Sequence, residues 1–241
     1  MLKMTVMAAL LSLSIPVHAD QYGAFERLAD SGSIKPFARD LGGVLGSSTF
    51  HSARSLGFSG FDVGVRGVMQ FGPDRDNRIL RGNGIDAFGL PWVQAEIGMP
   101  FRFDGFIRGI SYQGLTIAGG GLRYGLLKRG DAPWTPHLLA SGVGHSVVHE
   151  HFSASHVGGN LVGSMGIPLL TPYVGIGFDR TRVVVRSSTA DPLLIGHDVT
   201  TFESRFTAGA QTRPWPFFYL HAAYVLLHRQ SGAEAGMGIR F

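Results

Sequence analysis

Four histidines lie close together in one stretch of the chain, and histidine is a common metal ligand in proteins. His145, His149, His151 and His156 surround Glu150, and imidazole and carboxylate groups together suit Zn²⁺ or Cu²⁺. The segment His149 to His151, however, falls at a predicted hairpin, where exposed polar residues occur without any ligand. We therefore expect no metal and no cofactor, and these four histidines are the candidates if a metal binds.

Charged side chains share one face of the segments that carry them. In a membrane β-barrel, an arginine on the lipid-facing surface near the bilayer midplane costs about 2 to 4 kcal/mol. If these segments are strands of such a barrel, the face that carries the charges therefore lines a polar lumen. The residues expected to line it are Asp62, Arg66, Glu96, Arg102, Asp104, Arg108, Arg123, Asp179, Glu203, Arg205, Glu234 and Arg240. In the main hypothesis they fill and hold the lumen, and in the alternative they serve permeation.

The elements that position these charges alternate between apolar and polar residues with a period of two. In residues 60–72, for example, Val63 and Val65 share one face, and Asp62 and Arg66 share the other. The alternation predicts about ten antiparallel strands at 60–72, 91–99, 101–111, 115–127, 134–148, 152–167, 171–186, 200–212, 217–228 and 231–241. Pairing of the first strand with the last would bring Asp62 and Arg66 near Glu234 and Arg240, where the charges pair across the seam.

Both ends of the chain indicate an exported membrane protein. Lys3 precedes an apolar run and a small-residue site at Val17-His18-Ala19, which is typical of a cleaved signal peptide over residues 1–19. The last eleven residues alternate and finish on an aromatic. Met237, Ile239 and Phe241 are the expected barrel assembly signal. The predicted fold class is all-β, a transmembrane antiparallel up-and-down β-barrel.

Composition agrees with this fold class and excludes others. The chain has 241 residues, 44% of them hydrophobic, and no cysteine, so it has neither disulfides nor a lipid-anchor cysteine. After the leader, no stretch approaches the roughly 18 apolar residues of a spanning helix. The net charge of +4 is small and scattered, so we expect no nucleic-acid partner.

The lengths of the connections assign the two ends of the barrel. Two long polar loops, 73–89 and 187–198, fall on the predicted outer side. The short turns at 99–100, 168–171 and 213–216 fall on the inner side. An aromatic girdle is expected at the inner ends of the strands, formed by Phe101, Trp134, Tyr173, Trp215, Phe217 and Phe241.

Residues 20–58 precede the first strand and interleave apolar residues with glycines. They form a partly helical plug that tucks into the inner mouth or, equally, a periplasmic tail that covers the barrel base. Gly119 to Gly121 would let such a segment approach closely, because a strand without side chains leaves room for another backbone.

An enzyme is the third functional hypothesis. Outer-membrane proteases and lipid hydrolases place histidine, serine and carboxylates at the barrel rim, and His145, Ser146 and His149 are the candidates here. The sequence shows neither a nucleophile-elbow pattern nor oriented triad spacing. We therefore expect no enzyme and no catalytic residue.

Three motifs carry a family resemblance. They are Gly98-Met99-Pro100-Phe101, Gly119 to Tyr124, and Thr171 to Gly177, together with the terminal aromatic. They resemble small outer-membrane barrels distantly akin to the fatty-acid transporter and type IX secretion shuttle group. The resemblance implies an amino-terminal hatch inside the barrel and a hydrophobic ligand. The chain departs from that group in its length and strand count.

These observations divide the chain into a signal peptide (1–19), an N-terminal segment (20–58) and a barrel (59–241). The leading hypothesis is a protein of the bacterial outer membrane that acts as a passive channel or docking site for a small molecule. The candidate ligand is a hydrophobic molecule. The alternative is a structural or adhesion barrel with a filled lumen and functional extracellular loops. Expected partners are outer-membrane lipids, lipopolysaccharide and, through the C-terminal strand, the barrel-assembly machinery.

Overall fold

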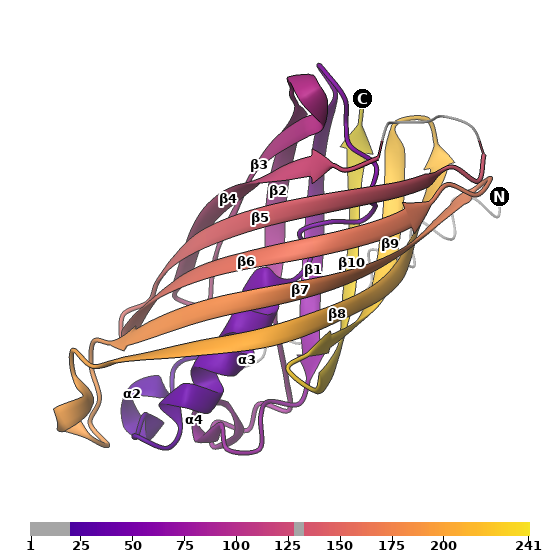
Figure 1. Ribbon diagram of the computed structural model, residues 1–241. Helices are drawn as coiled ribbons and strands as arrows, with labels where there is room; N and C mark the ends of the chain where they lie inside the picture. Colours follow the sequence, from indigo (N-terminus) through magenta and orange to yellow (C-terminus); the bar gives the residue numbers. More distant parts are fainter. Residues whose placement is uncertain (1–19, 128–132) are drawn as a thin grey trace.

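The computed structural model describes residues 20–127 and 133–241, so the proposed leader lies outside the described residues. Ten strands close into one antiparallel barrel, and the first strand pairs with the last (Figure 1). The predicted antiparallel barrel is confirmed. The strands are β1 Phe61–Phe71, β2 Ala87–Gly98, β3 Phe103–Tyr112, β4 Leu115–Gly125, β5 Pro136–Val148, β6 Phe152–Met165, β7 Leu170–Val185, β8 Asp198–Trp215, β9 Phe218–Leu227 and β10 Gln230–Arg240.

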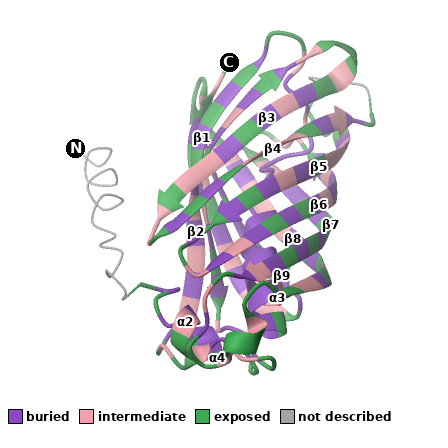
Figure 2. Ribbon diagram, turned by 90° about the vertical axis from the view of Figure 1, so that its left-hand side faces the viewer, coloured by how far each residue is buried: buried purple, intermediate pink, exposed green. Residues whose placement is uncertain are grey.

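Each strand presents alternate residues to the two faces of the barrel wall. In β1, Val65 and Phe71 are exposed outside, whereas Asp62 and Arg66 are buried inside. Figure 2 shows the same alternation along the other strands. Strand geometry explains why the sequence predicts these faces, because successive side chains of a strand point to opposite sides.

The two ends of the barrel differ in their connections. One end, the turn end, carries short turns such as η1 (Pro100–Arg102) and the C-terminal residue Phe241. The other, the loop end, carries residues 72–86 with α4 (Arg78–Arg81) and residues 186–197 with η2 (Pro192–Leu194). The two long polar loops therefore lie at the same end, as predicted.

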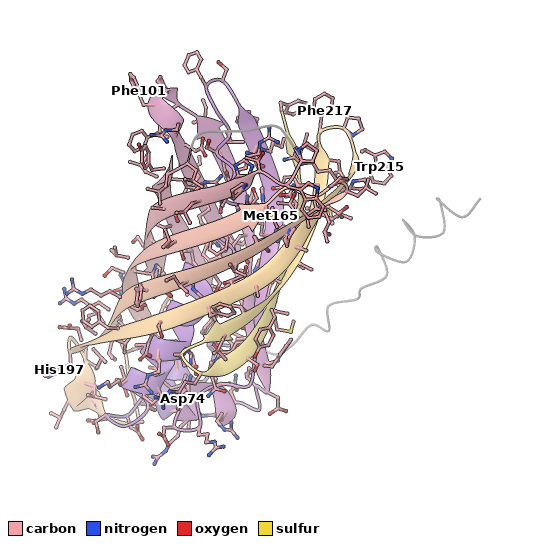
Figure 3. All side chains as sticks on the ribbon, turned by 45° about the vertical axis from the view of Figure 1, so that its right-hand side comes forward. Asp74, Phe101, Met165, His197, Trp215 and Phe217 are labelled. Carbon is pink, nitrogen blue, oxygen red and sulfur yellow. The ribbon has the colours of Figure 1, made fainter. Side chains whose placement is uncertain are left out.

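Aromatic side chains surround the turn end. Phe101, Trp215 and Phe217 project outward there, while Asp74 and His197 lie at the opposite end (Figure 3). Trp134 and Phe241 are exposed as well. Tyr173 is the exception, because it faces the lumen, is 2% exposed and packs edge-on against Phe50 at 6.0 Å between ring centroids. Its predicted place in the girdle is wrong.

The N-terminal segment passes through the barrel from one end to the other. Near the loop end, the Thr189 backbone N–H donates to the carbonyl of Glu26 in α2 (Phe25–Leu28). Helix α3 (Ile34–Gly46) then enters the lumen (Figure 1), and the Ser59 N–H bonds the Gly98 carbonyl at the turn end. Of the two alternatives for residues 20–58, the structure therefore supports the partly helical plug, and the tail that only covers the barrel base is wrong. The plug runs the length of the lumen instead of stopping at one mouth. Among the described residues, no helix is long and apolar enough to cross a membrane.

The loop-end half of the lumen is an apolar core rather than a polar space. From α2 and α3, Phe25, Phe37 and Leu41 are buried in it. The barrel wall contributes inward-facing apolar residues that include Leu90, Trp92, Val147, Phe152, Val183, Val185, Val225 and Leu227. This core resembles that of a soluble protein, and it secures the helix by burial of apolar surface.

Glycines of α3 allow the helix to lie against the wall. A Cβ atom at Gly42 would meet Thr181, one at Gly43 would lie 3.1 Å from the Cβ of Leu227, and one at Gly46 would overlap Asp179. Gly119 to Gly121 act differently, because their nearest neighbours are adjacent strands and the side chains of His145, Phe106 and Ile107. The expectation that these three glycines admit the N-terminal segment is wrong.

Candidate functional site

The predicted lumen charges fall into three groups. Nine are buried inside the barrel: Asp62, Arg66, Glu96, Asp104, Arg108, Arg123, Asp179, Arg205 and Glu234. Glu203 and Arg240 are partly exposed on the same inner face, toward opposite ends. Arg102 lies instead in the η1 turn, where it donates to the Tyr124 hydroxyl at 2.8 Å and to the Leu126 carbonyl at 3.1 Å. Its predicted lumen position is wrong, because the chain turns before β3 begins.

A compact ion-pair network fills the middle of the lumen. Glu96 accepts a hydrogen bond from Arg66 and forms an ion pair with Arg123, each at 2.6 Å. Asp104 lies 3.5 Å from Arg123 and accepts from the Leu56 backbone N–H at 3.0 Å. Arg66 of β1 therefore pairs mainly with Glu96 of β2, rather than with Glu234 across the β1–β10 junction. Arg240 of β10 donates to the Arg54 carbonyl.

Residues 47–58 of the N-terminal segment are held by these charges through their backbone. Arg108 donates to the Ser47 carbonyl at 2.9 Å, and Arg66 donates to the Ser48 carbonyl at 3.3 Å. The Ser48 N–H donates to Glu234 at 3.0 Å. Hydrogen bonds that involve a charged group are stronger than those between neutral groups. The network therefore fixes the path of residues 47–58, and its ion pairs also balance the charges of the lumen.

The predicted histidine cluster divides into two separate places. His145 and His156 lie in the lumen with their Nδ1 atoms 3.0 Å apart, and His156 bonds Asp179 at 3.2 Å. His149 stacks on Phe152 at the loop end, where His151 bonds the Ser187 hydroxyl at 2.7 Å. Within residues 20–127 and 133–241, no group of three or more His, Cys, Asp or Glu side chains could hold a metal ion.

The candidate rim-enzyme residues do not converge either. His145 is buried in the lumen, whereas Ser146, the next residue along β5, is exposed on the outside of the barrel. Adjacent strand residues face opposite sides, so these two side chains cannot share one active site. The grouping of His145, Ser146 and His149 is therefore wrong.

A lateral cleft opens where β8 runs past its neighbour β9. The last pair between the two strands is Arg205 with Leu227, and the His228 N–H donates to the Ser204 carbonyl at 3.2 Å. Residues 198–203 of β8 have no β9 partner, and α3 lies behind this part of the wall (Figure 1). The cleft has a volume of about 590 Å³ and is lined by Arg39, Ile176, Gly177, Phe178, Glu203, Ser204, Arg205, Phe206, Leu226, His228 and Arg229.

The cleft joins two kinds of surface. Ile176, Phe178, Phe206 and Leu226 belong to the exposed apolar exterior of the barrel. The floor is polar, because Arg39 of α3 donates to Glu203 of β8 at 2.7 Å. A molecule with an apolar part and a polar part therefore finds a matching surface for each. The volume lies within the range of small-molecule sites, roughly 300–1,000 Å³.

A polar bridge ties the helix to the loop end beside the cleft. Arg39 also donates to Asp74 at 3.0 Å, and Asp40 accepts from His228 at 2.8 Å. Burial raises the pKa of Asp74, but the Asp76 backbone N–H and the Arg39 guanidinium outweigh it and hold that pKa below its usual value. The bridge connects α3, the loop of residues 72–86 and the β9–β10 turn.

The β9–β10 turn has an unusual composition for its backbone. His228 and Arg229 have φ angles of 36° and 80°, a region that two-residue hairpin turns normally fill with Asn and Gly. The β3–β4 turn at the same end follows that preference, with Gly114 at its second position. The side chains of His228 and Arg229 are thus retained in a backbone conformation that is strained for residues other than glycine. The His228 side chain points inward and bonds Asp40.

A second hollow adjoins the lateral cleft, and a third lies at the turn end of the described surface. A groove of about 680 Å³ on the outside of β6–β8 shares Phe178, Glu203 and Ser204 with the lateral cleft and extends to Arg180 and Phe202. A smaller cavity of about 380 Å³ lies at the turn end beside Arg54, His137 and Arg213. The lateral cleft depends on the stagger of β8 against β9. Residue alternation does not encode that stagger, so no signal in the sequence predicts the cleft.

No protein-family model matches the chain, and no curated protein matches it. Solved barrel structures are similar in part. The N-terminal β-barrel domain of Pseudomonas aeruginosa OprF is 14% identical over 77% of this chain and 99% of that domain, with a TM-score of 0.40. The KdgM porin in complex with disordered oligogalacturonate is 9% identical over 75% and 99%, with a TM-score of 0.41. Ail, the attachment invasion locus protein of Yersinia pestis, is 12% identical over 76% and 99%, with a TM-score of 0.29. These comparisons do not show membership of the fatty-acid transporter group.

Proposed function

We propose that the protein is an outer-membrane β-barrel whose lumen is closed by its own N-terminal segment and that docks a small hydrophobic molecule without chemical conversion. The outer surface supports a membrane location, because Val65, Ile97, Ile107 and Val174 are 53%, 54%, 70% and 54% exposed. A soluble barrel rarely leaves so much apolar surface in water. A closed antiparallel barrel also pairs all of its strands, as lipid requires.

The outward residues of β7 support a position for the membrane edge. Val174, Ile176 and Phe178 are apolar, and Arg180 and Arg182 follow on the same face toward the loop end. A spanning strand needs about 9–11 residues, which fits a belt that ends near Phe178. In this proposal the loop end faces outward and the turn end faces the periplasm. A signal peptide over residues 1–19 would deliver the chain there.

The observation that carries the proposal is the filled lumen. Helix α3 and residues 47–58 occupy it, and the charges that would line a pore are buried in ion pairs or bonded to the segment. A barrel filled in this way supports docking at its surface better than free diffusion through its centre. Kinship with the fatty-acid transporter group belongs to the same proposal, supported by an N-terminal segment inside the barrel.

Single-channel conductance tests this proposal. Because the chain has no native cysteine, an engineered disulfide can hold α3 in place during the measurement. A Cβ at Gly42 would lie 3.1 Å from the Cβ of Thr181, so the pair Gly42→Cys and Thr181→Cys can join α3 to β7. We expect no steady conductance from wild type or from the oxidised pair. Steady conductance in the oxidised form would contradict a closed lumen, because the locked helix could not have left.

Retention of a bound molecule tests the docking part. Native mass spectrometry of the protein after delipidation and addition of a dioleoyl lipid should show one retained lipid per chain. A structural barrel with functional loops is the second candidate, favoured by the balanced charges of the lumen. That candidate gains support if the protein neither conducts nor retains lipid.

Two further interactions complete the proposal. Met237 and Ile239 project from the outer face of β10, and Phe241 is the exposed last residue. These positions support recognition of the last strand by the barrel-assembly machinery. Outer-membrane lipids and lipopolysaccharide would surround the exposed belt.

A further inference from the structure

We infer that the lateral cleft, with the groove beside it, binds a phosphate-bearing lipid of the surrounding leaflet, held by Arg180 and Arg229. This inference rests on the proposed docking function and assigns it a place and a ligand class. The cleft supplies the apolar surface for an acyl chain. The two arginines supply the charge for the headgroup.

The two arginines flank the same stretch of β8. Arg180 on β7 pairs in register with Phe202, and its guanidinium lies 5.5 Å from the centre of the Phe202 ring. Arg229 follows His228, whose N–H bonds the Ser204 carbonyl. One strand thus separates the two arginines, which places their backbones about 10 Å apart, or two strand spacings.

Neither arginine is neutralised within the described part of the chain. Both are exposed, and no salt bridge joins either one to a carboxylate there. The neighbouring Arg182 differs, because it forms a two-bond pair with Asp198 at 2.9 and 3.1 Å. Arg180 and Arg229 therefore retain their donors for an anion, and guanidinium groups bind phosphate oxygens well.

The depth of the site matches a lipid headgroup. Arg180 is the first charged residue beyond the apolar outward positions Val174, Ile176 and Phe178 on β7. Lipid phosphates lie at this boundary, and arginine near a membrane edge extends its guanidinium toward them. An acyl chain from that headgroup would run along Phe178 and Phe206 into the cleft, which opens through the wall on the lipid side.

The backbone at Arg229 indicates that its side chain is retained for a purpose. Its φ of 80° is a conformation that glycine adopts without strain, and Gly114 occupies the matching position of the β3–β4 turn. A purely structural turn would gain from glycine at 229. Strained positions of this kind persist at ligand contacts.

The test compares two lipids with identical chains on the full-length protein. Dioleoylphosphatidic acid carries a phosphate, and dioleoylglycerol does not. Native mass spectrometry measures the fraction of each retained by wild type, by the double variant Arg180→Gln/Arg229→Gln, and by the control Arg75→Gln, which alters an exposed arginine of the loop 72–86. We expect retention of the phosphatidic acid to fall on the order of tenfold in the double variant alone.

Arg229→Gly separates a lipid-binding role from a structural one. It removes the guanidinium and relieves the backbone, so we expect weaker phosphatidic acid retention with an unfolding midpoint in urea that is unchanged or higher. A lower midpoint would assign Arg229 to the fold and overturn its place in the site.

The remaining outcomes are distinct. Equal retention of both lipids by wild type, or of phosphatidic acid by wild type and the double variant, overturns the phosphate site and leaves docking intact. Retention of neither lipid by wild type overturns the docking function itself, together with this site.

Discussion

At the loop end of the lumen, α3 lies in an apolar core, whereas midway along the barrel residues 47–58 lie among paired charges. Phe37 represents the first region, with ring centroids 5.1 Å from those of both Phe25 and Phe152. Glu96 represents the second, with two arginines at 2.6 Å. The first region stabilises the helix by burial, and the second fixes the path of the segment by hydrogen bonds. The same chain is thus held by two different kinds of interaction.

The largest expected effect is in the apolar region. Phe37→Ala should lower the free energy of unfolding by about 3–5 kcal/mol, because it removes a buried ring and leaves a cavity. Urea unfolding in detergent micelles, followed by tryptophan fluorescence, measures this. Phe58→Ala is the control, since Phe58 is 77% exposed. An equal loss in both variants would show that α3 is not packed in a core.

The charged region should respond next. Glu96→Gln leaves Arg66 and Arg123 short of one buried negative charge, and we expect a loss of about 3 kcal/mol in the same unfolding assay. Glu150→Gln, an exposed loop substitution, should change the value by less than about 0.5 kcal/mol. If Glu96→Gln lowers the free energy of unfolding no more than Glu150→Gln does, the lumen charges are solvated, and hydrogen bonds to them do not fix the path of the segment.

The smallest effect concerns the bridge between the helix and the loop end. The lowered pKa of Asp74 means that its ionised form stabilises the fold above its usual pKa and that this contribution is lost as the pH falls through the lowered value. Between about pH 6 and about pH 3, wild type should therefore lose more stability than Asp74→Asn. Asp76→Asn, at an exposed neighbour, should lose as much as wild type. Equal losses of stability in wild type and Asp74→Asn would show that the bridge through Asp74 does not stabilise the fold.

The strands were predictable because alternation of residue type reports directly on the two faces of a wall. The predicted strand at 152–167 is β6, Phe152–Met165, and the last strand at 231–241 is β10, Gln230–Arg240. The loop-end core was missed because it reverses the expected polarity, with Val183 and Val185 inside and Arg180 and Arg182 outside. A single alternation pattern does not show where the inner face of the wall changes from polar to apolar.

Contacts between distant residues were harder to predict. Alternation places Tyr173 on a face, but not beside Phe50, and it places Asp62 and Arg66 inside without naming Glu96 as the partner of Arg66. The four histidines share a stretch of sequence, yet they separate because His145 and His156 lie on the inward faces of the wall strands β5 and β6, whereas residues 149–151 form the turn between these strands at the loop end. Spacing along the chain determines neither strand stagger nor the path of a segment through a barrel.

Disulfide formation between α3 and β9 tests most directly whether the N-terminal segment lies inside the barrel. A Cβ at Gly43 would lie 3.1 Å from the Cβ of Leu227, near the roughly 3.5–4.5 Å of disulfides. Leu226 is the matched control, since it faces outward. We expect Gly43→Cys/Leu227→Cys to form a disulfide on oxidation of the folded protein, seen as a shift on a non-reducing gel, and Gly43→Cys/Leu226→Cys to form none. Free thiols in the first pair, or equal cross-linking in both, would contradict a segment that lies inside the barrel.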